Sequence, residues 1–438
     1  MSVVTPPRRA AILGGNRIPF GKAGGAYAGA SNLDLLTAAL DGLIARFSLQ
    51  GERLGDVSAG AVLKHSRDFN LTREAVLGTT LDPHTSAFDV QRACATSMEA
   101  AWSVANKIAL GQIESGIAGG VDSTSDAPIV VSDRLRRALL KLSRATTLGR
   151  RARVLATISP RDLAPVAPSV NEPRTHLSMG EHQALTTAAK AITRADQDQL
   201  ALDSHRHLAA AYERGLFDSL LTPYRGLTRD ESLRVDTSME KLATLSPVFG
   251  TSGEDPSMTA GNSTPLSDGA ATVLLASEAW AQARGLPALA YVVDAEAAAV
   301  DFVHGSEGLL MGGAYAVPRL LHRAGLTLAD FDFVEIHEAF ASTVLATIGA
   351  WADEDFNRRA FDAPALGELD RSRLNVAGSS LAAGHPFAAT GARILATLAT
   401  LLAERKATGP GAPDRPVRGL ISVCAAGGQA TAMIVEAA

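Results

Sequence analysis

Cysteine is scarce in this 438-residue chain, which contains only Cys94 and Cys424. Two cysteines cannot form a disulfide framework, and no group of Cys and His residues has the spacing of a structural zinc site. We therefore expect a reducing compartment, with the cytoplasm as the location, and we expect no metal site.

The chain also has no excess of basic charge, few aromatic residues and no long apolar run. The net charge is -5 and aromatic residues make up 5% of the chain. This composition offers no basic surface with interleaved aromatics for stacking bases, so it excludes a general nucleic-acid binder. We find no signal peptide, no peroxisomal address and no run of about 18 apolar residues, and we expect no membrane span.

The residues that are present favour a soluble globular protein of two or three domains, with 46% hydrophobic and 20% charged residues. In the first part of the chain, apolar strands alternate with helices. The expected strands lie within 10–21, 57–63 and 115–123, and the expected helices within 33–47 and 98–112. Strands that are apolar on both faces predict a parallel sheet covered by helices on each side.

The last part of the chain repeats this order of elements. It has expected strands at 289–300 and 331–336, a helix at 316–325, and two hairpin-like strands within 418–437. "GIAGGVDS" (116–123) and "LISVCAAGG" (420–428) occupy equivalent places, so a duplicated α/β unit is predicted. The expected divisions are an N-terminal core (1–128), an inserted, mostly helical loop domain (129–258), a return to the N-terminal core (259–284) and a C-terminal core (285–438).

The expected insertion is strongly basic in one stretch. The stretch from Asp133 to Asp162 contains nine basic residues and only two acidic ones. The segment "DRLRRALLKLSR", which contains Arg134, Arg136 and Arg137, is typical of a cationic amphipathic helix that lies on anionic lipid or docks a partner. A solvated face near the phosphates of a ligand is the alternative.

Cys94 lies where a helix is expected to begin, between Ala95 and Met98. The helix dipole lowers a thiol pKa of about 8.5 by roughly one unit, which leaves much of the thiol protonated at neutral pH. A nucleophilic role therefore needs a base, and a buried structural cysteine is the alternative. His385 follows a glycine-rich loop that the duplication places opposite the Cys94 loop, so the two residues form a candidate nucleophile–base pair.

Two further residues are candidates for chemistry. Cys424 ends a strand, and the small residues after it, including Ala426, expose backbone amides suited to binding an oxyanion. His337 is flanked by Glu335 and Glu338, which are expected to favour its protonated state or to orient its neutral ring. A buried small residue and a solvated loop end are the respective alternatives.

Four motifs carry a family resemblance. "CATS", "HEAF", "GHPFAATGAR" and "CAAGGQA", in this order and spacing, resemble the four active-site loops of thiolases, and "AGNSTPLSDGAA" and "KLATLSPVF" resemble other thiolase stretches. The family usually has Asn at position 337, Gly at 387 or 388, and Gly at 426. Here these positions are His337, Phe387, Ala388 and Ala426, a pattern similar to β-subunits of multienzyme fatty-acid oxidation complexes.

The resemblance implies a thiolase-like α/β fold, a duplicated five-layer αβαβα core with an inserted loop domain. It also implies an acyltransferase that cleaves 3-ketoacyl-CoA with CoA, through an acyl-enzyme on Cys94. The implied catalytic residues are Cys94, His385, Cys424 and His337, and the implied oxyanion-hole groups belong to Ala426, Cys94 and His385. Thr264, Met179 and His176 match family positions along the pantetheine path, and CoA is a substrate, so we expect no cofactor.

The resemblance further implies a homodimer or tetramer, and it makes a hydratase/dehydrogenase α-type subunit and a peripheral membrane surface candidate partners. Three alternatives stay open: an acetoacetyl-CoA thiolase, a condensing enzyme of the β-ketoacyl synthase type, and a non-catalytic protein that binds acyl-CoA. Cys424 separates the first two, because synthases generally use His or Asn where thiolases use this second cysteine.

Overall fold

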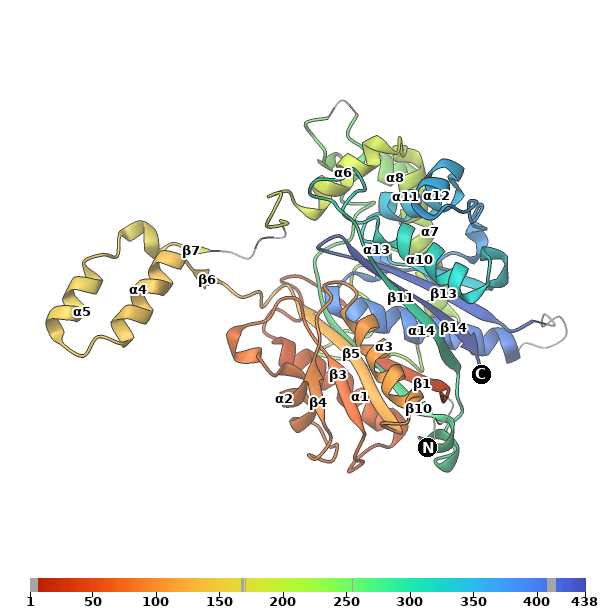
Figure 1. Ribbon diagram of the computed structural model, residues 1–438, viewed down its shortest axis with the longest axis horizontal. Helices are drawn as coiled ribbons and strands as arrows, with labels where there is room; N and C mark the ends of the chain where they lie inside the picture. Colours follow the sequence, from red (N-terminus) through yellow and green to blue (C-terminus); the bar gives the residue numbers. More distant parts are fainter. Residues whose placement is uncertain (1–6, 167–168, 170, 254, 408–414) are drawn as a thin grey trace.

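A computed structural model describes residues 7–438 apart from 167–168, 170, 254 and 408–414 (Figure 1). The strands are β1 Ala10–Arg17, β2 Gly21–Lys22, β3 Asp56–Ala59, β4 Ala87–Asp89, β5 Ser115–Ser123, β6 Val130–Val131, β7 Pro165–Val166, β8 Pro247–Phe249, β9 Met258–Thr259, β10 Ser267–Ser277, β11 Ala290–Ala299, β12 Phe333–Ile336, β13 Arg418–Ala425 and β14 Gln429–Ala437. The helices are α1 Asn32–Phe47, α2 Leu71–Leu77, α3 Thr96–Ala109, α4 Asp133–Ser143, α5 Leu148–Leu155, α6 Met179–Ala189, α7 Arg194–Glu213, α8 Met239–Ala243, α9 Glu278–Ala283, α10 Gly312–Ala324, α11 Ala341–Ala352, α12 Glu354–Phe361, α13 Ser380–Ala383 and α14 Thr390–Ala407.

The main sheet is built from two copies of one unit. The strand order is β1-β10-β5-β3-β4 in the N-terminal half and β11-β14-β13-β12 in the C-terminal half. Leu374 forms a parallel bridge with β12, in the position that corresponds to β4. In each half the first two pairings are antiparallel and the others parallel. The predicted duplication is therefore confirmed, with β5 and β13 in equivalent places as expected.

The expectation of a parallel sheet is wrong, because each half is mixed. In the C-terminal half, β13 and β14 are joined by the short turn 426–428, and a turn of that length forces antiparallel pairing. The two halves meet where β1 pairs antiparallel with β11, with Ala10 opposite Val292.

Five layers result from this arrangement. Helices α1 and α2 cover the outer face of the N-terminal half, and α10 covers the outer face of the C-terminal half, with α11 packed on it. Between the halves lie α3 and α14, which contact strands of both and each other (Figure 1). The αβαβα core is as predicted.

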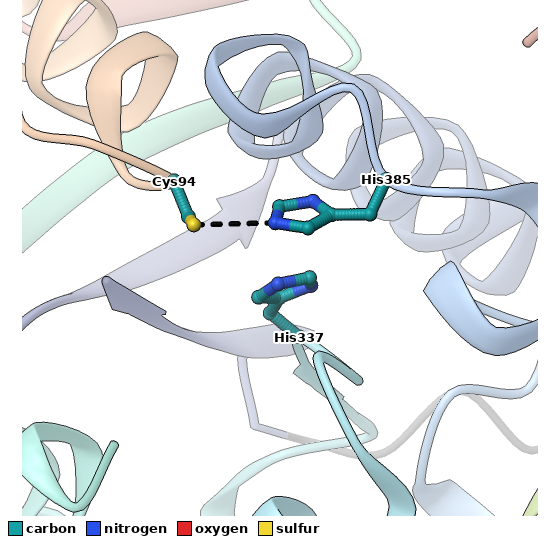
Figure 2. Close-up of side chains that lie close together, drawn as sticks. All are labelled: Cys94, His337 and His385. Atoms are coloured by element: carbon teal, nitrogen blue, oxygen red, sulfur yellow. Dashed lines mark hydrogen bonds between the residues drawn. The ribbon is translucent and has the colours of Figure 1, made fainter. Parts of the chain in front are cut away.

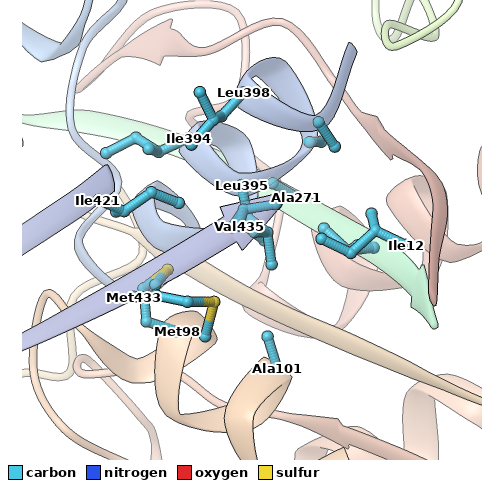
Figure 3. Close-up of a cluster of buried hydrophobic side chains, with 14 of the residues drawn as sticks. Ile12, Met98, Ala101, Ala271, Ile394, Leu395, Leu398, Ile421, Met433 and Val435 are labelled. Carbon is cyan, nitrogen blue, oxygen red and sulfur yellow. The ribbon is translucent and has the colours of Figure 1, made fainter. Parts of the chain in front are cut away.

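The central layer is the main hydrophobic core (Figure 3). Met98 and Ala101 of α3 and Ile394, Leu395 and Leu398 of α14 belong to one cluster, which strand residues such as Met433 and Val435 complete. Burying such side chains contributes about 25 cal/mol per Å² of apolar surface removed from water. The two helices that lead into the site are thereby held by the largest cluster of buried apolar side chains among the described residues.

The segment Phe387–Ala407 is long and apolar enough to cross a membrane, with a mean hydropathy of 1.3. Most of it lies inside the protein, because 78% of its apolar window is buried between the two half-sheets. Thr390, Arg393 and Thr397 interrupt the segment, so it is not a continuous apolar run, and the expectation of no membrane span stays a prediction. The helix is buried on nearly all sides because it is the central core helix.

Residues between β5 and β9 form α4 to α8 and three short strands. α6 and α7 pack on α11, and α7 also packs on α13. By contrast, α4 and α5 form a helical pair that projects from the body, which we call the arm (Figure 1). Its helices are capped by Ser132 and Thr147, whose hydroxyls accept hydrogen bonds from the backbone amides of Leu135 and Arg150.

Candidate active site

Cys94 lies in a tight turn between β4 and α3. Ala93 has a φ of 44°, a left-handed conformation that is strained for a residue with a Cβ. The turn is held by Thr96, whose hydroxyl accepts from the Arg92 amide at 2.9 Å and donates to the Ala93 carbonyl at 2.7 Å. Helix α3 begins at Thr96, so Cys94 precedes a helix N-terminus as predicted.

His385 reaches Cys94 from the second copy of the unit (Figure 2). Its Nε2 lies 3.2 Å from the Cys94 Sγ, although the residues are 291 positions apart in the sequence. Its Nδ1 lies 2.6 Å from the Thr390 hydroxyl, and its backbone amide donates to the Ser267 hydroxyl at 3.1 Å. The structure therefore brings the predicted pair into contact.

A close approach of α3 and α14 makes this contact possible. A Cβ on Gly391 would lie 2.5 Å from the Met98 Cγ and 2.8 Å from the Met98 backbone nitrogen. Glycine is thus required for the helices to meet at this point. The Ala392 amide donates to the Ser97 hydroxyl at 2.8 Å, which joins the first turns of the two helices directly.

His337 is completely buried beside His385, and the two ring centroids are 4.1 Å apart (Figure 2). Its Nδ1 lies 2.9 Å from the Ser380 hydroxyl, which also accepts a hydrogen bond from Arg393 at 3.1 Å. Its Nε2 has no hydrogen-bond partner among the described residues. This nitrogen is a free polar group at the site.

The hydrogen-bond partners allow the two histidines different tautomers. The Ser380 hydroxyl, which accepts from Arg393, can donate to Nδ1 of His337, and we assign the His337 proton to Nε2 in the resting site. The Cys94 thiol can donate to Nε2 of His385, and we assign the His385 proton to Nδ1, on the side of Thr390. In this assignment His385 is a proton acceptor at the site, and His337 is a hydrogen-bond donor.

The expected effect of the flanking glutamates on His337 is wrong. Neither glutamate contacts its ring: Glu338 accepts from Ser204 and Asn375, each at 2.7 Å, and both Glu335 oxygens lack a hydrogen-bond partner in the part of the chain that is described. Burial, followed by the charges of His385 and Arg393, lowers the pKa of His337 well below its usual range. The ring is neutral.

Burial also keeps the Cys94–His385 pair uncharged. It raises the pKa of the Cys94 thiol to about 12, against hydrogen bonds from the backbone amides of Ala426 and Cys94 that favour the thiolate. It lowers the pKa of His385 to about 3, with Arg393 acting in the same direction. The pair therefore rests as a thiol and a neutral imidazole, and the helix dipole does not overcome this.

Cys424 is the penultimate residue of β13 and packs among apolar side chains. Its side chain is 5% exposed and packs in a cluster with Met258, Leu309, Leu310, Ala339 and Phe340. Burial raises the pKa of its thiol, and the charge of Cys94 raises it further, so the two cysteines lie within electrostatic reach of each other. The Ala426 amide hydrogen-bonds to the Cys94 sulfur, so this amide points at the nucleophile, next to which an oxyanion would form.

Of the three residues expected along the pantetheine path, two lie beside the Cys424 cluster and one is exposed. Thr264 donates from its hydroxyl to the Ala339 carbonyl at 3.0 Å, next to the Cys424 cluster. Met179, the first residue of α6, packs against that cluster. His176 is exposed, and its backbone rather than its ring bonds to Glu172 and Asn171.

Two cavities lie near these residues. One, of about 300 Å³, has the basic residues Lys22, Arg234 and Lys241 in its wall and reaches inward to Ser263 and Leu381. Leu381 follows Ser380, the partner of His337, so this cavity leads toward the site. A second cavity, of about 1090 Å³, lies between α6 and the 248–258 segment and is lined by Phe249 and Met258, members of the cluster around Cys424 or packed against it.

Sequence reasoning missed the residues that position the site. Ser380, Thr390 and Arg393 lie near His385 in the chain, but nothing in the motif marked them as partners of the two rings. Asp122 accepts from the Ala388 amide at 2.9 Å, and Glu172 accepts from the Gly427 amide at 2.6 Å. Asp122, which follows the glycine-rich stretch "GIAGGV", offered a signal in the sequence, whereas Glu172 offered none.

Comparison with known proteins identifies the family. The model of the thiolase N-terminal domain matches residues 10–279, and that of the thiolase C-terminal domain matches residues 286–437. The chain belongs to the thiolase family. It is accordingly an enzyme of the acyltransferase class.

Individual thiolases resemble the chain over nearly its whole length. A 3-ketoacyl-CoA thiolase of Yersinia enterocolitica is 41% identical over 435 residues, 98% of this chain and 97% of the relative. Among solved structures, the Bacillus anthracis acetyl-CoA acetyltransferase has a TM-score of 0.79 at 29% identity, with 99% and 100% of the chains covered. A human mitochondrial 3-ketoacyl-CoA thiolase, solved in complex with CoA, has a TM-score of 0.78 at 27% identity, with 98% of each chain covered.

Proposed function

We propose that the chain cleaves 3-ketoacyl-CoA with CoA, giving acetyl-CoA and an acyl-CoA two carbons shorter, as a step of fatty-acid β-oxidation. The observation that carries the proposal is the contact of 3.2 Å between the Cys94 Sγ and the His385 Nε2. The 41% identity to 3-ketoacyl-CoA thiolases supports the substrate class. The direction of the reaction in the cell depends on metabolite concentrations.

The first half-reaction forms an acyl-enzyme. His385 takes the proton of Cys94 as the sulfur attacks the 3-keto carbon, so no free thiolate is needed at rest. The tetrahedral alkoxide is met by the backbone amides of Cys94 and Ala426, which bond to the sulfur in the resting site. The carbon–carbon bond then breaks, and Cys424 gives its proton to the carbon of the acetyl-CoA enolate.

The enolate oxygen needs a donor while that bond breaks. The Nε2–H of His337, free in the resting site, is the group that we assign to it, with protonated His385 beside it. In the second half-reaction, the Cys424 thiolate takes the proton of CoA, whose sulfur attacks the thioester. Cys94 leaves and recovers its proton from His385, so both cysteines and the histidine return to their starting states.

CoA is proposed to enter through the cavity of about 300 Å³. Arg234 suits its phosphates, whereas Lys241 is already paired with Asp236 of the same wall, and Ser263 and Leu381 lead toward His337. Thr264 and Met179 then adjoin the pantetheine arm near Cys424. Charge reversal at Arg234 should raise the KM for CoA with little effect on the acylation step; an unchanged KM would remove this assignment.

Two substitutions test the roles of the cysteines. Cys94→Ala should bind CoA but form no acyl-enzyme, and normal covalent labelling of that variant would refute the assignment. Cys424→Ala should still be acylated but should not exchange deuterium at the acetyl-CoA methyl group. Thiolysis measured against ketoacyl chain length, followed by loss of the enolate absorbance, separates an acetoacetyl-CoA enzyme from a longer-chain one.

We further propose that the arm docks on an anionic lipid surface. It carries most of the nine basic residues between Asp133 and Asp162, and it exposes Leu139, Leu140, Leu148 and Leu155. This combination of positive charge and apolar side chains is complementary to anionic lipid. Charge reversal at Arg134, Arg136 and Arg137 should abolish co-sedimentation with vesicles containing phosphatidylserine. If the variant instead still binds the vesicles but no longer binds an α-type subunit, the arm docks on that partner. The homodimer or tetramer, the cytoplasmic location and the absence of a cofactor stay predictions.

A further inference from the structure

Three potential metal ligands converge at the site from segments far apart in the sequence. One donor atom each from Cys94, His337 and His385 lies within 4.8 Å of the other two (Figure 2). A tetrahedral zinc ion with bonds of about 2.0 to 2.3 Å places its S and N ligands about 3.3 to 3.5 Å apart. Side-chain movements of about 1 Å therefore bring all three donors onto one ion.

The free nitrogen of His337 is a second, independent observation. His337 is completely buried, and its Nε2 has no hydrogen-bond partner in the described chain. Ser380 permits the tautomer that a metal requires, because its hydroxyl oxygen can accept from Nδ1–H as well as donate to Nδ1. Cys94 is only half-buried, so an ion can reach its sulfur along the substrate path.

We propose that Cys94, His337 and His385 form an inhibitory site for a divalent transition-metal ion, with Zn²⁺ the expected occupant. One sulfur and two imidazole nitrogens are ligands that Zn²⁺ prefers, and the fourth position is open to water. On binding, the Cys94 S–H bond breaks, its proton passes to solvent, and one Zn–S and two Zn–N bonds form without any redox change. The bound ion occupies the nucleophile and the base together, so it stops acylation.

The environment limits the strength of this site. Arg393 is buried, and its positive charge acts on both histidines and opposes a dication, whereas the Asp122 carboxyl lies within electrostatic reach of Cys94. When the Cys94 thiol loses its proton, the negative charge on its sulfur compensates for the positive charge of Arg393. Binding should therefore weaken as the pH falls and should release about one proton per ion.

Cobalt binding tests the site without any acyl-CoA. Co²⁺ added to the full-length enzyme should produce a thiolate-to-metal charge-transfer band that Zn²⁺ removes. Cys424→Ala keeps all three donors and should keep the band, whereas Cys94→Ala should lose it and His337→Asn should weaken Co²⁺ binding at least tenfold. His84→Ala, at an exposed histidine that pairs with Asp82, controls for surface binding and should change nothing.

A band that is absent in the wild-type enzyme, or that persists in Cys94→Ala, would overturn the proposal. Circular dichroism of each variant shows that lost binding is not lost folding. As a second readout, Zn²⁺ should slow thiolysis at least tenfold, with recovery on chelation. Active enzyme that binds no Co²⁺ would refute the metal site and leave the proposed reaction standing, whereas Co²⁺ binding by an inactive enzyme would do the reverse.

Discussion

Gly391→Ala is expected to separate the two catalytic residues. The new Cβ would lie 2.5 Å from the Met98 Cγ, 2.8 Å from the Met98 nitrogen and 3.0 Å from the Ser97 hydroxyl. Backbone cannot yield as a flexible side chain can, so the start of α14 must shift away from α3. Overpacking of this kind costs about 1 to 3 kcal/mol in unfolding free energy.

The catalytic cost should be larger than the loss of stability. A shift of about 1 Å between a nucleophile and its base lowers kcat by about 100-fold. The assays are single-turnover acylation and chemical unfolding. Gly349→Ala is the matched control, because Gly349 lies in α11 with nothing within 4 Å of a new Cβ. It should keep full activity and gain up to about 1 kcal/mol. Gly391→Ala with wild-type kcat would refute the argument that this contact sets the geometry.

Three further results are expected. Burial raises the pKa of Glu335 to about 8, above its unfolded value of about 4.3. The stability that depends on a protonated Glu335 is fully present below the unfolded pKa and is lost as the pH rises through 8. Glu335→Gln should therefore be more stable than wild type at pH 9, by an amount on the order of a few kcal/mol, and should differ little from it at pH 4. Equal unfolding midpoints at pH 9 would contradict this. Ser380→Ala should lower kcat about 10- to 100-fold, because it removes the hydroxyl that sets the tautomer of His337. Ser379→Ala removes only a hydrogen bond from Arg393 and leaves the Ser380–His337 contact intact, so it should have a smaller effect. Equal effects of the two substitutions would argue against tautomer control by Ser380. Because burial lowers the pKa of His385 to about 3, the acylation rate should stay within about twofold between pH 5 and 7, and a decline centred near pH 6.5 would contradict a neutral base.

The local pattern of the sequence was sufficient to predict most helices and strands, and the internal duplication was sufficient to predict the pairing of Cys94 with His385. The strand predicted at 115–123 is β5, and the helix predicted at 33–47 corresponds to α1. These segments have strong periodicity or composition, which short-range physics determines. The pairing followed from the duplication, because equivalent loops of two related units meet at the axis between them.

Long-range features could not be predicted in the same way. Strand direction depends on which strands become neighbours, so the mixed sheet was missed. The charge state of His337 was misjudged because its neighbours in sequence, Glu335 and Glu338, point elsewhere, while Ser380 and Arg393 arrive from other segments. Burial, which sets the pKa of both cysteines and both histidines, is a property of the assembled fold.

The most direct test of the account is the site of covalent acylation. The enzyme is mixed with a 3-ketoacyl-CoA, quenched in acid, digested and analysed by mass spectrometry. The account predicts the acyl mass on the peptide that contains Cys94 and none on the peptide that contains Cys424, with labelling lost in a His385→Ala variant that remains folded. Acyl mass on Cys424, or turnover with no acyl mass on Cys94, would contradict it.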